Sequence, residues 1–312
     1  MLPKPPAREP STGFLFCPPY RVQGVSIAGE ATTIQIPELD VCFDMGAPLR
    51  SALAAKYVAV SHGHMDHIGG LAYYASQRRF QGMGTGTIVC LESLARPLDK
   101  MLRAYNDVEG QKTPYELVPL KPEEPFEIKN NIFIRLFELE HTVPCAGYVI
   151  YERRSKLKPE FREMTQEQLH VLRDGGTELT YWLEVPQVTY LGDTLPGGPL
   201  LREDVRTSPL VIAECTFVEP DHKDRSRIGK HLHIDDIAEW LPVLECETLV
   251  LMHLSRRSNM ADARKALKER IGFNHAKRVE FLMDHRTNKM RYERQVMDAE
   301  REARARVATT RS

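Results

Sequence analysis

Short apolar runs alternate with turn residues along most of the chain. In the first half, such runs occupy 22–28, 32–36, 40–43, 57–61, 87–91, 115–120, 132–137 and 147–151. In the second half the pattern returns at 180–185, 187–192, 210–214, 248–252 and 278–283. Runs of four to eight β-branched and apolar residues between turn signals predict β-strands.

Segments of helical character lie between these strands. They occupy 68–80, 94–105, 165–172, 234–244 and 261–271, and a charged run from 286 to 306 contains Ala and few helix breakers. The last segment alternates Glu and Arg, which favours an exposed helix with i,i+4 ion pairs. In each half of the chain, strands come first and a helix follows a strand. This repeated order predicts a sheet-on-sheet core covered by helices in a single α/β domain.

The 312 residues allow one large domain or two ordinary ones. Six prolines in 1–20 predict an irregular N-terminal lead-in, and we expect one domain over 21–284. Within it, 152–179 is a charged, irregular stretch, and insertions of this kind are usually functional or disordered. Residues 285–312 form a predicted basic, helical C-terminal extension.

The overall charge hides an uneven distribution. A hydrophobic fraction of 42% and a charged fraction of 27% exclude wholesale disorder. A net charge of −1 argues against a nucleic-acid partner when it is averaged over the chain. However, residues 254–312 hold 16 basic and 8 acidic residues, so an acidic body carries a basic C-terminal end.

Targeting signals are not apparent in the sequence. Residues 1–6 contain no apolar run, so we expect no secretory signal. No apolar run approaches the roughly 18–20 residues of a membrane helix, so we expect no membrane partner. The six cysteines are far apart and form no C-x-x-C, which suits reduced thiols and predicts a cytoplasmic protein.

The most informative segment follows the predicted strand 57–61. It carries His62, His64, Asp66 and His67 within six residues. Strand periodicity puts positions 62, 64 and 66 on one side, and the turn into the next helix can bring His67 toward a second metal. Imidazole and carboxylate are zinc ligands, so this spacing predicts a metal site rather than a His-rich surface turn.

Two metal ions need more ligands than this loop provides. His141, Asp193 and His253 each stand where an apolar run ends. Taken singly, Asp193 also suits a turn or a helix N-cap, and His253 also suits a half-buried structural histidine. Together they complete two ligand sets.

These segments resemble the metallo-β-lactamase superfamily and, within it, the short, plant-like form of the tRNase Z family of tRNA 3′-processing endoribonucleases. The resemblance rests on 24–29, 43–46, 61–70, 141–148, 152–179, 192–194, 214–217, 231–237 and 253–256. It implies an αββα sandwich, in which two mixed β-sheets pack face to face with helices outside and carry an inserted flexible arm.

The resemblance also implies ligand sets. One Zn²⁺ is expected at His62, His64 and His141, and a second at Asp66, His67 and His253. Asp193 is expected to bridge the two ions. Mn²⁺ or Fe²⁺ can fill such sites as well. His64 stands where the di-iron flavoproteins of this superfamily have Glu, which favours the hydrolytic branch.

The expected reaction is removal of the 3′ trailer from precursor tRNA. Hydroxide attacks a phosphodiester and leaves a tRNA 3′-OH, while Asp66 holds the nucleophile. His231 is expected to protonate the leaving oxygen, with Glu214 orienting it. His233 is expected on the same side of the segment as His231 and stays an alternative proton donor. A supporting role at a helix N-terminus is favoured for it.

The stretch 152–179 corresponds to the arm with which this family holds tRNA. Its basic side chains suit phosphate contacts, and a solvated charged loop is the alternative. The expected contacts are Arg153, Arg154, Lys156, Lys158, Arg162 and Arg173. The family is commonly a homodimer in which the arm of one subunit serves the other, so we expect a homodimer. The family's P-x-K-x-R-N loop is absent at 29–34, which leaves the handling of CCA-bearing precursors open.

Rival functions share parts of this pattern. A hydrolase of the same fold that acts on a small phosphodiester, thioester or lactone would share every metal ligand. A non-catalytic, metal-stabilised RNA-binding protein predicts decayed ligands, whereas every expected ligand is present. A scaffold using the basic C-terminal run is a third alternative, and that run could also contact tRNA or mediate dimerisation.

Overall fold

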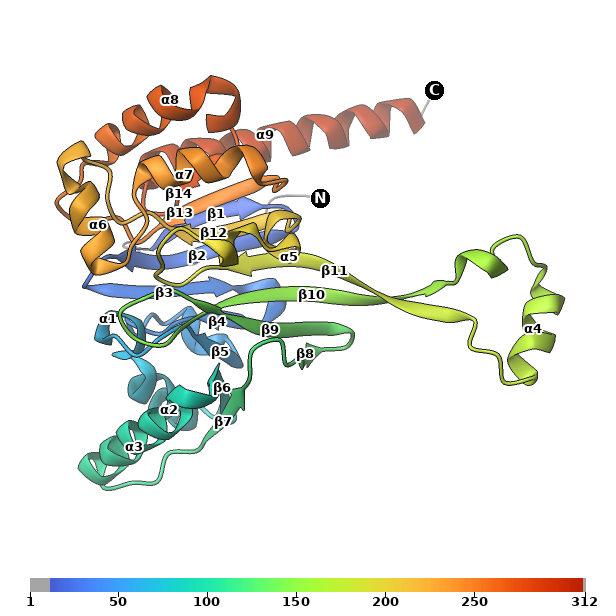
Figure 1. The fold of residues 1–312 in the computed structure, drawn as a ribbon, viewed down its shortest axis with the longest axis horizontal. Coiled ribbons are helices and arrows are strands. Elements are labelled where there is room, and N and C mark those ends of the chain that lie inside the picture. The colour runs from blue at the N-terminus through green and yellow to red at the C-terminus, as the bar shows by residue number, and fades with distance from the viewer. Residues whose placement is uncertain (1–11, 311–312) are drawn as a thin grey trace.

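The structure, a computed structural model, describes residues 12–310. Two seven-stranded sheets pack face to face, with helices on their outer faces (Figure 1). The first sheet is antiparallel from β1 to β4 and parallel from β4 to β7. Its strands are β1 (Gly13–Cys17), β2 (Tyr20–Ile27), β3 (Ala31–Ile36), β4 (Val41–Phe43), β5 (Tyr57–Val60), β6 (Gly86–Leu91) and β7 (Tyr115–Leu120).

The second sheet mirrors this mixed arrangement. It is antiparallel from β8 to β11 and parallel from β11 to β14. Its strands are β8 (Phe126–Lys129), β9 (Ile132–Leu139), β10 (Cys145–Leu157), β11 (Thr180–Tyr190), β12 (Leu210–Glu214), β13 (Thr248–Met252) and β14 (Val279–Phe281).

Helices cover both outer faces. The α-helices are α1 (Met65–Ile68), α2 (Leu71–Phe80), α3 (Glu92–Glu109), α4 (Gln166–Asp174), α5 (Glu203–Arg206), α6 (Lys223–Gly229), α7 (Ile234–Trp240), α8 (Met260–Ala276) and α9 (His285–Thr310). Leu98 and Leu102 of α3, one turn apart, pack with α2 on the first sheet. Ile237 of α7 and Leu267 of α8 pack on the second sheet.

The central core lies between the two sheets. Apolar side chains that alternate along the strands of both sheets form one buried cluster there. Phe43 of β4 and Tyr190 of β11 stack across the interface, with ring centroids 4.5 Å apart. The αββα sandwich predicted from the sequence is therefore confirmed.

The N-terminal lead-in differs from the prediction of an irregular segment over 1–20. Residues 1–11 lie outside the described part, but Gly13–Cys17 form β1, which pairs with β2. Leu15 and Cys17 point into the central core. The prolines in this segment hid the strand pattern, because Pro18 and Pro19 form the tight turn between two strands rather than an irregular run.

The charged stretch 152–179 is also more regular than predicted. Strands β10 and β11 continue out of the sheet, paired only with each other beyond Glu152 and before Val188. They carry α4, whose capping box joins Thr165 and Gln168. This hairpin with its helix projects far from the body (Figure 1). We call residues 152–185 the arm.

The predicted C-terminal extension, 285–312, forms helix α9 over His285–Thr310, and 311–312 lie outside the described residues. Its first turns pack on β1, where the ring of Tyr292 meets that of Phe14 at 5.4 Å. Arg291 and Gln295 donate hydrogen bonds to the carbonyl of Phe16. The rest of α9 extends away from the body (Figure 1). Among the described residues, none of the helices has the length and apolar content of a membrane span.

Candidate metal centre

The predicted ligands lie in loops that follow buried strands. Strand β5 is fully buried, and the chain then passes through His62 and His64 into the short helix α1, which carries Asp66 and His67. His64 is the N-cap residue of α1 and still has extended backbone angles. The change from strand to helix after His64 therefore turns the last two side chains toward the end of the same strand.

A first ligand set joins His62, His64, His141 and Asp193. Nε2 of His62 lies 3.1 Å from Nδ1 of His64, and Nε2 of His141 lies 3.3 Å from that same atom. Oδ2 of Asp193 is 3.8 Å from Nε2 of His62. Zinc bonds of about 2.0–2.1 Å in tetrahedral geometry separate neighbouring ligand atoms by roughly 3.3 Å, so these spacings fit one ion.

A second set lies beside the first. Nε2 of His253 is 3.4 Å from Nε2 of His67 and 3.4 Å from Oδ2 of Asp66. Oδ2 of Asp193 is 3.5 Å from His67 and 3.6 Å from His253. Because the same oxygen of Asp193 borders both sets, one carboxylate could join two ions.

The chemistry of Asp193 supports a cation at this position. The residue is 1% exposed, and its Oδ1 has no hydrogen-bond partner among the described residues. A buried carboxylate oxygen without a donor is costly unless a cation satisfies it. Burial alone would raise the pKa of Asp193, but His253 and His67 hold it well below its ordinary value. The residues therefore fit a pair of metal ions.

The histidines differ in their electrostatic surroundings. Burial, followed by the charge of nearby His67, lowers the pKa of His62 to about 2, so His62 is a neutral ligand. At His67, burial lowers the pKa, but Asp193 and Asp44 outweigh burial and raise it well above its ordinary value. Surroundings that stabilise a proton on His67 also favour a metal ion, because both carry positive charge.

Each of four ring nitrogens that face away from the centre has a partner. These outer contacts fix ring orientation and tautomer. The Nδ1 contacts are His62 with Ser61 Oγ at 2.9 Å, His67 with Asp44 Oδ2 at 2.8 Å, His141 with the Lys230 carbonyl at 3.0 Å, and His253 with Thr216 Oγ1 at 2.9 Å. His64 differs, since its Nδ1 faces the other ligands.

Beside the two ligand sets stands a carboxylate–histidine pair. Glu214, at the end of β12, is fully buried and lies 3.1 Å from Nδ1 of His231. Burial lowers the pKa of His231, but the charge of Glu214 outweighs it and raises the pKa to about 9. Nδ1 of His231 is 3.8 Å from Asp193, so the carboxylate–histidine pair stands at the edge of the centre.

An open cavity of about 610 Å³ lies next to His231. Its other walls include Gly29, Phe217, and three arginines, Arg225, Arg256 and Arg257. Arg256 forms an ion pair with Glu30 in the β2–β3 turn. Basic and aromatic side chains around His231 suit a phosphate-bearing substrate.

Comparison with known proteins agrees with this geometry. The profile of the Beta-lactamase superfamily domain matches residues 39–254. The tRNase Z TRZ2, chloroplastic, of Arabidopsis thaliana is 29% identical over 251 residues, which are 80% of this chain and 71% of that protein. The Nuclear ribonuclease Z of Triticum aestivum is 32% identical over 161 residues, which are 52% of this chain and 92% of that protein. The chain belongs to the metallo-β-lactamase superfamily and, within it, to the ribonuclease Z family.

Two solved structures resemble this chain in fold. The metallo-β-lactamase fold protein YhfI from Bacillus subtilis has a TM-score of 0.57 at 17% identity, covering 86% of this chain and 96% of that one. Human tRNase Z, short form, has a TM-score of 0.55 at 15% identity, covering 88% of this chain and 96% of that one. At these identities the likeness extends to the fold alone.

The two histidines that follow Lys230 in this chain, His231 and His233, lie in different surroundings. His233 is fully buried and belongs to neither ligand set. Its Nδ1 accepts from the Asp235 backbone N–H at 3.2 Å, and its Nε2 donates to the Glu219 carbonyl at 3.0 Å. His233 therefore caps the N-terminus of α7, while His231 borders the metal centre.

The six predicted basic contacts of the arm do not share one environment. Lys156, Arg162 and Arg173 are exposed. The remaining three pair with acidic neighbours: Arg154 with Glu152, Lys158 with Glu178, and Arg153 with Glu184. The structure thus brings the metal-site candidates together and leaves the arm candidates at a distance from them (Figure 1).

Two site residues had no assigned role in the sequence analysis. Asp44 is fully buried, accepts from Tyr190 Oη at 2.6 Å and contacts His67. Its backbone has φ of +55°, which the sequence does not reveal. Thr216 contacts both Glu214 and His253. Both lie in segments that carried the family resemblance, and that was the only available signal.

Proposed function

We propose that the protein is a metal-dependent endoribonuclease that removes the 3′ trailer from precursor tRNA. The observation that carries this proposal is the joint presence of two ligand sets sharing Asp193 and the Glu214–His231 pair at their edge. Membership of the ribonuclease Z family supplies the substrate class.

We assign one ion to His62, His64 and His141, the other to Asp66, His67 and His253, and the bridging position to Asp193. The nitrogen and oxygen donors, without cysteine, suit zinc and also admit Mn²⁺ or Fe²⁺. Two bound ions would lower the pKa of an attacking water and neutralise charge on the phosphoryl group.

Asp66 orients the attacking water and accepts its proton in this proposal. Burial alone would raise the pKa of Asp66, but its hydrogen bond with His253 and the charge of His67 hold it below its ordinary range. The backbone N–H of Gly29 donates to Oδ2 of Asp66 at 2.9 Å. The carboxylate therefore stays ionised and fixed in direction.

His231 supplies the proton for the leaving oxygen. Glu214 occupies Nδ1, which leaves Nε2 as the nitrogen for transfer. Glu214 is itself held by the backbone N–H groups of Thr194 and Leu232 at 3.0 and 3.1 Å. An acid whose pKa lies near the working pH transfers its proton most effectively. The leaving group is then the tRNA 3′-OH, and the trailer keeps a 5′-phosphate.

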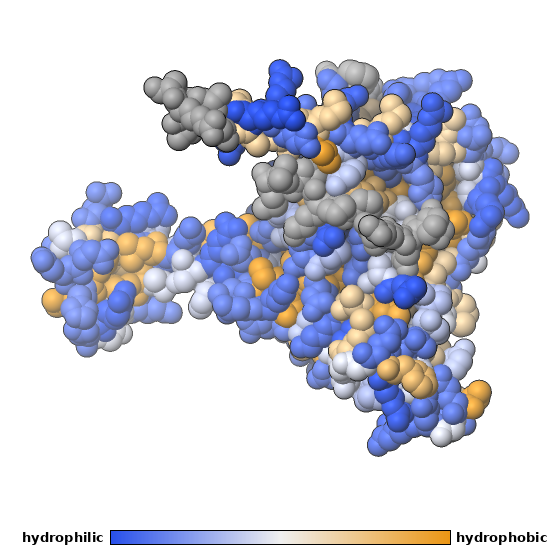
Figure 2. All heavy atoms as spheres, turned by 180° about the vertical axis from the view of Figure 1, so that it is seen from behind, coloured by the Kyte–Doolittle hydropathy of each residue, from blue (hydrophilic) through white to orange (hydrophobic). Residues whose placement is uncertain are grey.

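The arm holds the tRNA away from the cut in this proposal. Exposed Lys156, Arg162 and Arg173 suit phosphate contacts, which position a substrate without reading its sequence. The arm also exposes apolar side chains, among them Val171 and Trp182, and Figure 2 shows hydrophobic surface on it amid hydrophilic surface.

We further propose a homodimer that acts in the cytoplasm. In Figure 1 the arm extends from the side of the body opposite α1, which carries two ligands. This direction supports an arm that serves the metal centre of a partner. All six cysteines are free and buried, which suits a reducing compartment. Light scattering of the purified protein tests the dimer.

Two substrates given to the same preparation test the proposed reaction. A precursor tRNA with a 3′ trailer and bis-p-nitrophenyl phosphate should both be cleaved. Cleavage of the small ester alone, at any enzyme concentration, would assign the protein to the small-substrate hydrolases of this fold. Full ligand sets that support cleavage of neither substrate would leave an RNA-binding role.

A further inference from the structure

The root of the arm contains a network of ion pairs that the reaction does not use. Glu184 of β11 lies where the hairpin leaves the sheet, directly opposite Arg153 of β10. One of its oxygens is 2.6 Å from Arg135 Nη1, and the other is 3.1 Å from Arg153 Nε. Arg135 belongs to β9, in the body. One carboxylate of the arm is therefore shared between an arginine of the body and an arginine of the arm.

Both arginines are held by aromatic rings as well. The guanidinium of Arg135 lies 4.6 Å from the ring centroid of Tyr151, and that of Arg153 lies 4.3 Å from the ring centroid of Phe133. The two rings stack on each other at 5.8 Å. Each guanidinium group thus lies over an aromatic ring, and this contact helps to orient the two donors toward Glu184.

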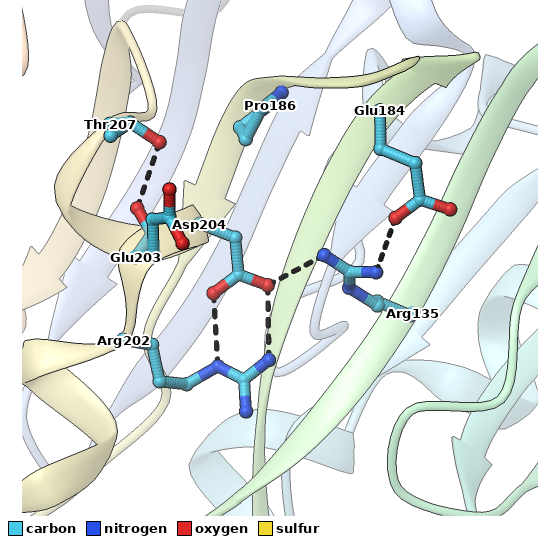
Figure 3. Close-up of a pocket in the computed structure, with 7 residues that line it drawn as sticks. All are labelled: Arg135, Glu184, Pro186, Arg202, Glu203, Asp204 and Thr207. Atoms are coloured by element: carbon cyan, nitrogen blue, oxygen red, sulfur yellow. Dashed lines mark hydrogen bonds and ion pairs between the residues drawn. The ribbon is translucent and has the colours of Figure 1, made fainter. Parts of the chain in front are cut away.

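The network continues into the body. Arg135 also donates to Asp204 of α5 at 2.8 Å, and Asp204 accepts from Arg202 at 3.0 Å (Figure 3). These side chains border a cavity of about 500 Å³ beside the arm root. The side chain of Asp204 is 10% exposed and that of Arg135 is 18% exposed, so solvent screens this end only partly.

The backbone at the same level gives the arm freedom to change direction. Beyond Glu152 and before Val188 the hairpin has no further strand beside it within its sheet. A register shift between Ile150 and Tyr151 leaves Gln187 as an extra residue on β11. Bulges bend and twist a two-stranded ribbon, and ribbons without neighbours are weakly held. One backbone hydrogen bond, from the N–H of Arg153 to the carbonyl of Asn131 at 2.8 Å, also joins the arm to the body at this level. Side-chain contacts at the root therefore add to a weak backbone connection in setting the direction of the arm.

We propose that Glu184 is a positioning residue that fixes the direction of the arm relative to the body. Arg135 and Arg153 hold its carboxylate from two sides, and Asp204 holds Arg135. For its kinetic consequence this proposal rests on the proposed tRNA cleavage. A fixed arm presents the held tRNA to a metal centre at a high effective concentration, whereas a swinging arm spreads the substrate over many directions.

The direction of the arm can be measured without any activity. Val171 on α4 and Val108 on α3 are 71% and 85% exposed, and Val171→Cys with Val108→Cys places one label on each part. The native cysteines are buried, so the introduced thiols react selectively. Electron–electron double resonance between spin labels then gives the distance distribution. Spin-diluted dimers, formed with excess unlabelled chain, isolate the distance within one chain.

The expected result is a narrow distribution in the parent and one at least about twice as wide in Glu184→Ala. Glu280→Ala is the matched control, because Glu280 also lies between two arginines, 3.2 Å from Arg291 and 3.8 Å from Arg264, but stands on the edge strand β14, with β13 and β12 between it and β11. A broad distribution in the parent, or an unchanged width in Glu184→Ala, would overturn the proposal.

The kinetic half of the test uses both substrates. Glu184→Ala should raise KM for precursor tRNA by about fivefold or more, with kcat and hydrolysis of bis-p-nitrophenyl phosphate unchanged. Equal loss on both substrates would indicate a damaged fold and contradict a positioning role. If the parent cleaves no precursor tRNA, the proposed function fails, while the distance distributions still decide the role of Glu184.

Discussion

Oε1 of Glu214 lies 3.1 Å from Nδ1 of His231, at the edge of two ligand sets that share one carboxylate. Glu214 is fully buried, so its charge acts on His231 with little screening by water. This relationship makes the imidazole a stronger base than free histidine and leaves its second nitrogen for the substrate. It gives the proposed reaction a pH dependence that can be measured.

Activity should fall as the pH rises through about 9. The proton donor must be protonated, and the pKa of His231 is raised to about 9 because Glu214 outweighs the effect of burial. Glu214→Gln removes the charge, so the pKa should move down toward its ordinary value of about 6.5. The alkaline fall of kcat for precursor tRNA should therefore shift to lower pH in this variant. An alkaline limb at the same pH in both proteins would contradict the assigned donor.

His231→Ala and His233→Ala should have different effects, the first on catalysis and the second on stability. The first removes the proton donor and should lower kcat for precursor tRNA by about 10²-fold or more, while both metal ions are retained. The second removes the cap of α7 and should lower the free energy of unfolding by about 0.5–2 kcal/mol, with little effect on kcat.

In each variant, single-turnover kinetics measures the rate of cleavage, metal analysis measures the bound ions, and urea unfolding measures the free energy of unfolding. Retained turnover in His231→Ala, together with lost turnover in His233→Ala, would reverse the assignment of the two histidines.

Asp44→Asn should weaken zinc binding without removing a ligand. Asp44 contacts Nδ1 of His67 at 2.8 Å, and loss of such outer partners typically costs 10–100-fold in metal affinity. Asp40→Asn is a matched control, because Asp40 also has positive φ, at 59°, but hydrogen-bonds to Lys56 instead. Chelator competition measures both affinities. Equal affinities in the two variants would show that Asp44 does not support the centre.

Deletion of residues 155–176 should separate the two substrates. The deletion removes α4 and most of the arm but leaves the ligand loops and the core intact. Cleavage of precursor tRNA should be lost, because the phosphate contacts are gone, while bis-p-nitrophenyl phosphate is still hydrolysed. A parallel loss of both activities would count against a binding role for the arm.

Much of the fold was predictable because its strands follow simple patterns. The buried runs that become β5 and β13 are almost wholly apolar, and a histidine follows each of them within two residues. The segment Gly13–Cys17 was missed because the prolines around it suggested irregular chain, although Pro18 and Pro19 form a turn between paired strands. The run 180–185 predicted the arm part of β11, whereas the arm part of β10 was missed because residues 152–156 are all polar, which removes the alternation that marks a half-buried strand.

The ligand loop was predictable because four donors lie within six residues. His141, Asp193 and His253 could be chosen as candidates, but only the tertiary structure brings them within 4.8 Å of their partners. Asp44 and the network around Glu184 could not be predicted from spacing. They depend on contacts between strands far apart in sequence, such as the 49 residues between Arg135 and Glu184.

The position and chemistry of the cut test the central claim most directly. A 5′-labelled precursor tRNA with a 3′ trailer is incubated with the zinc-loaded protein, and the ends of both products are determined. The account predicts one cut at the 3′ boundary of the tRNA, a tRNA 3′-OH and a trailer 5′-phosphate. No cut in the precursor, or a tRNA product ending in a 3′-phosphate or 2′,3′-cyclic phosphate, would contradict it.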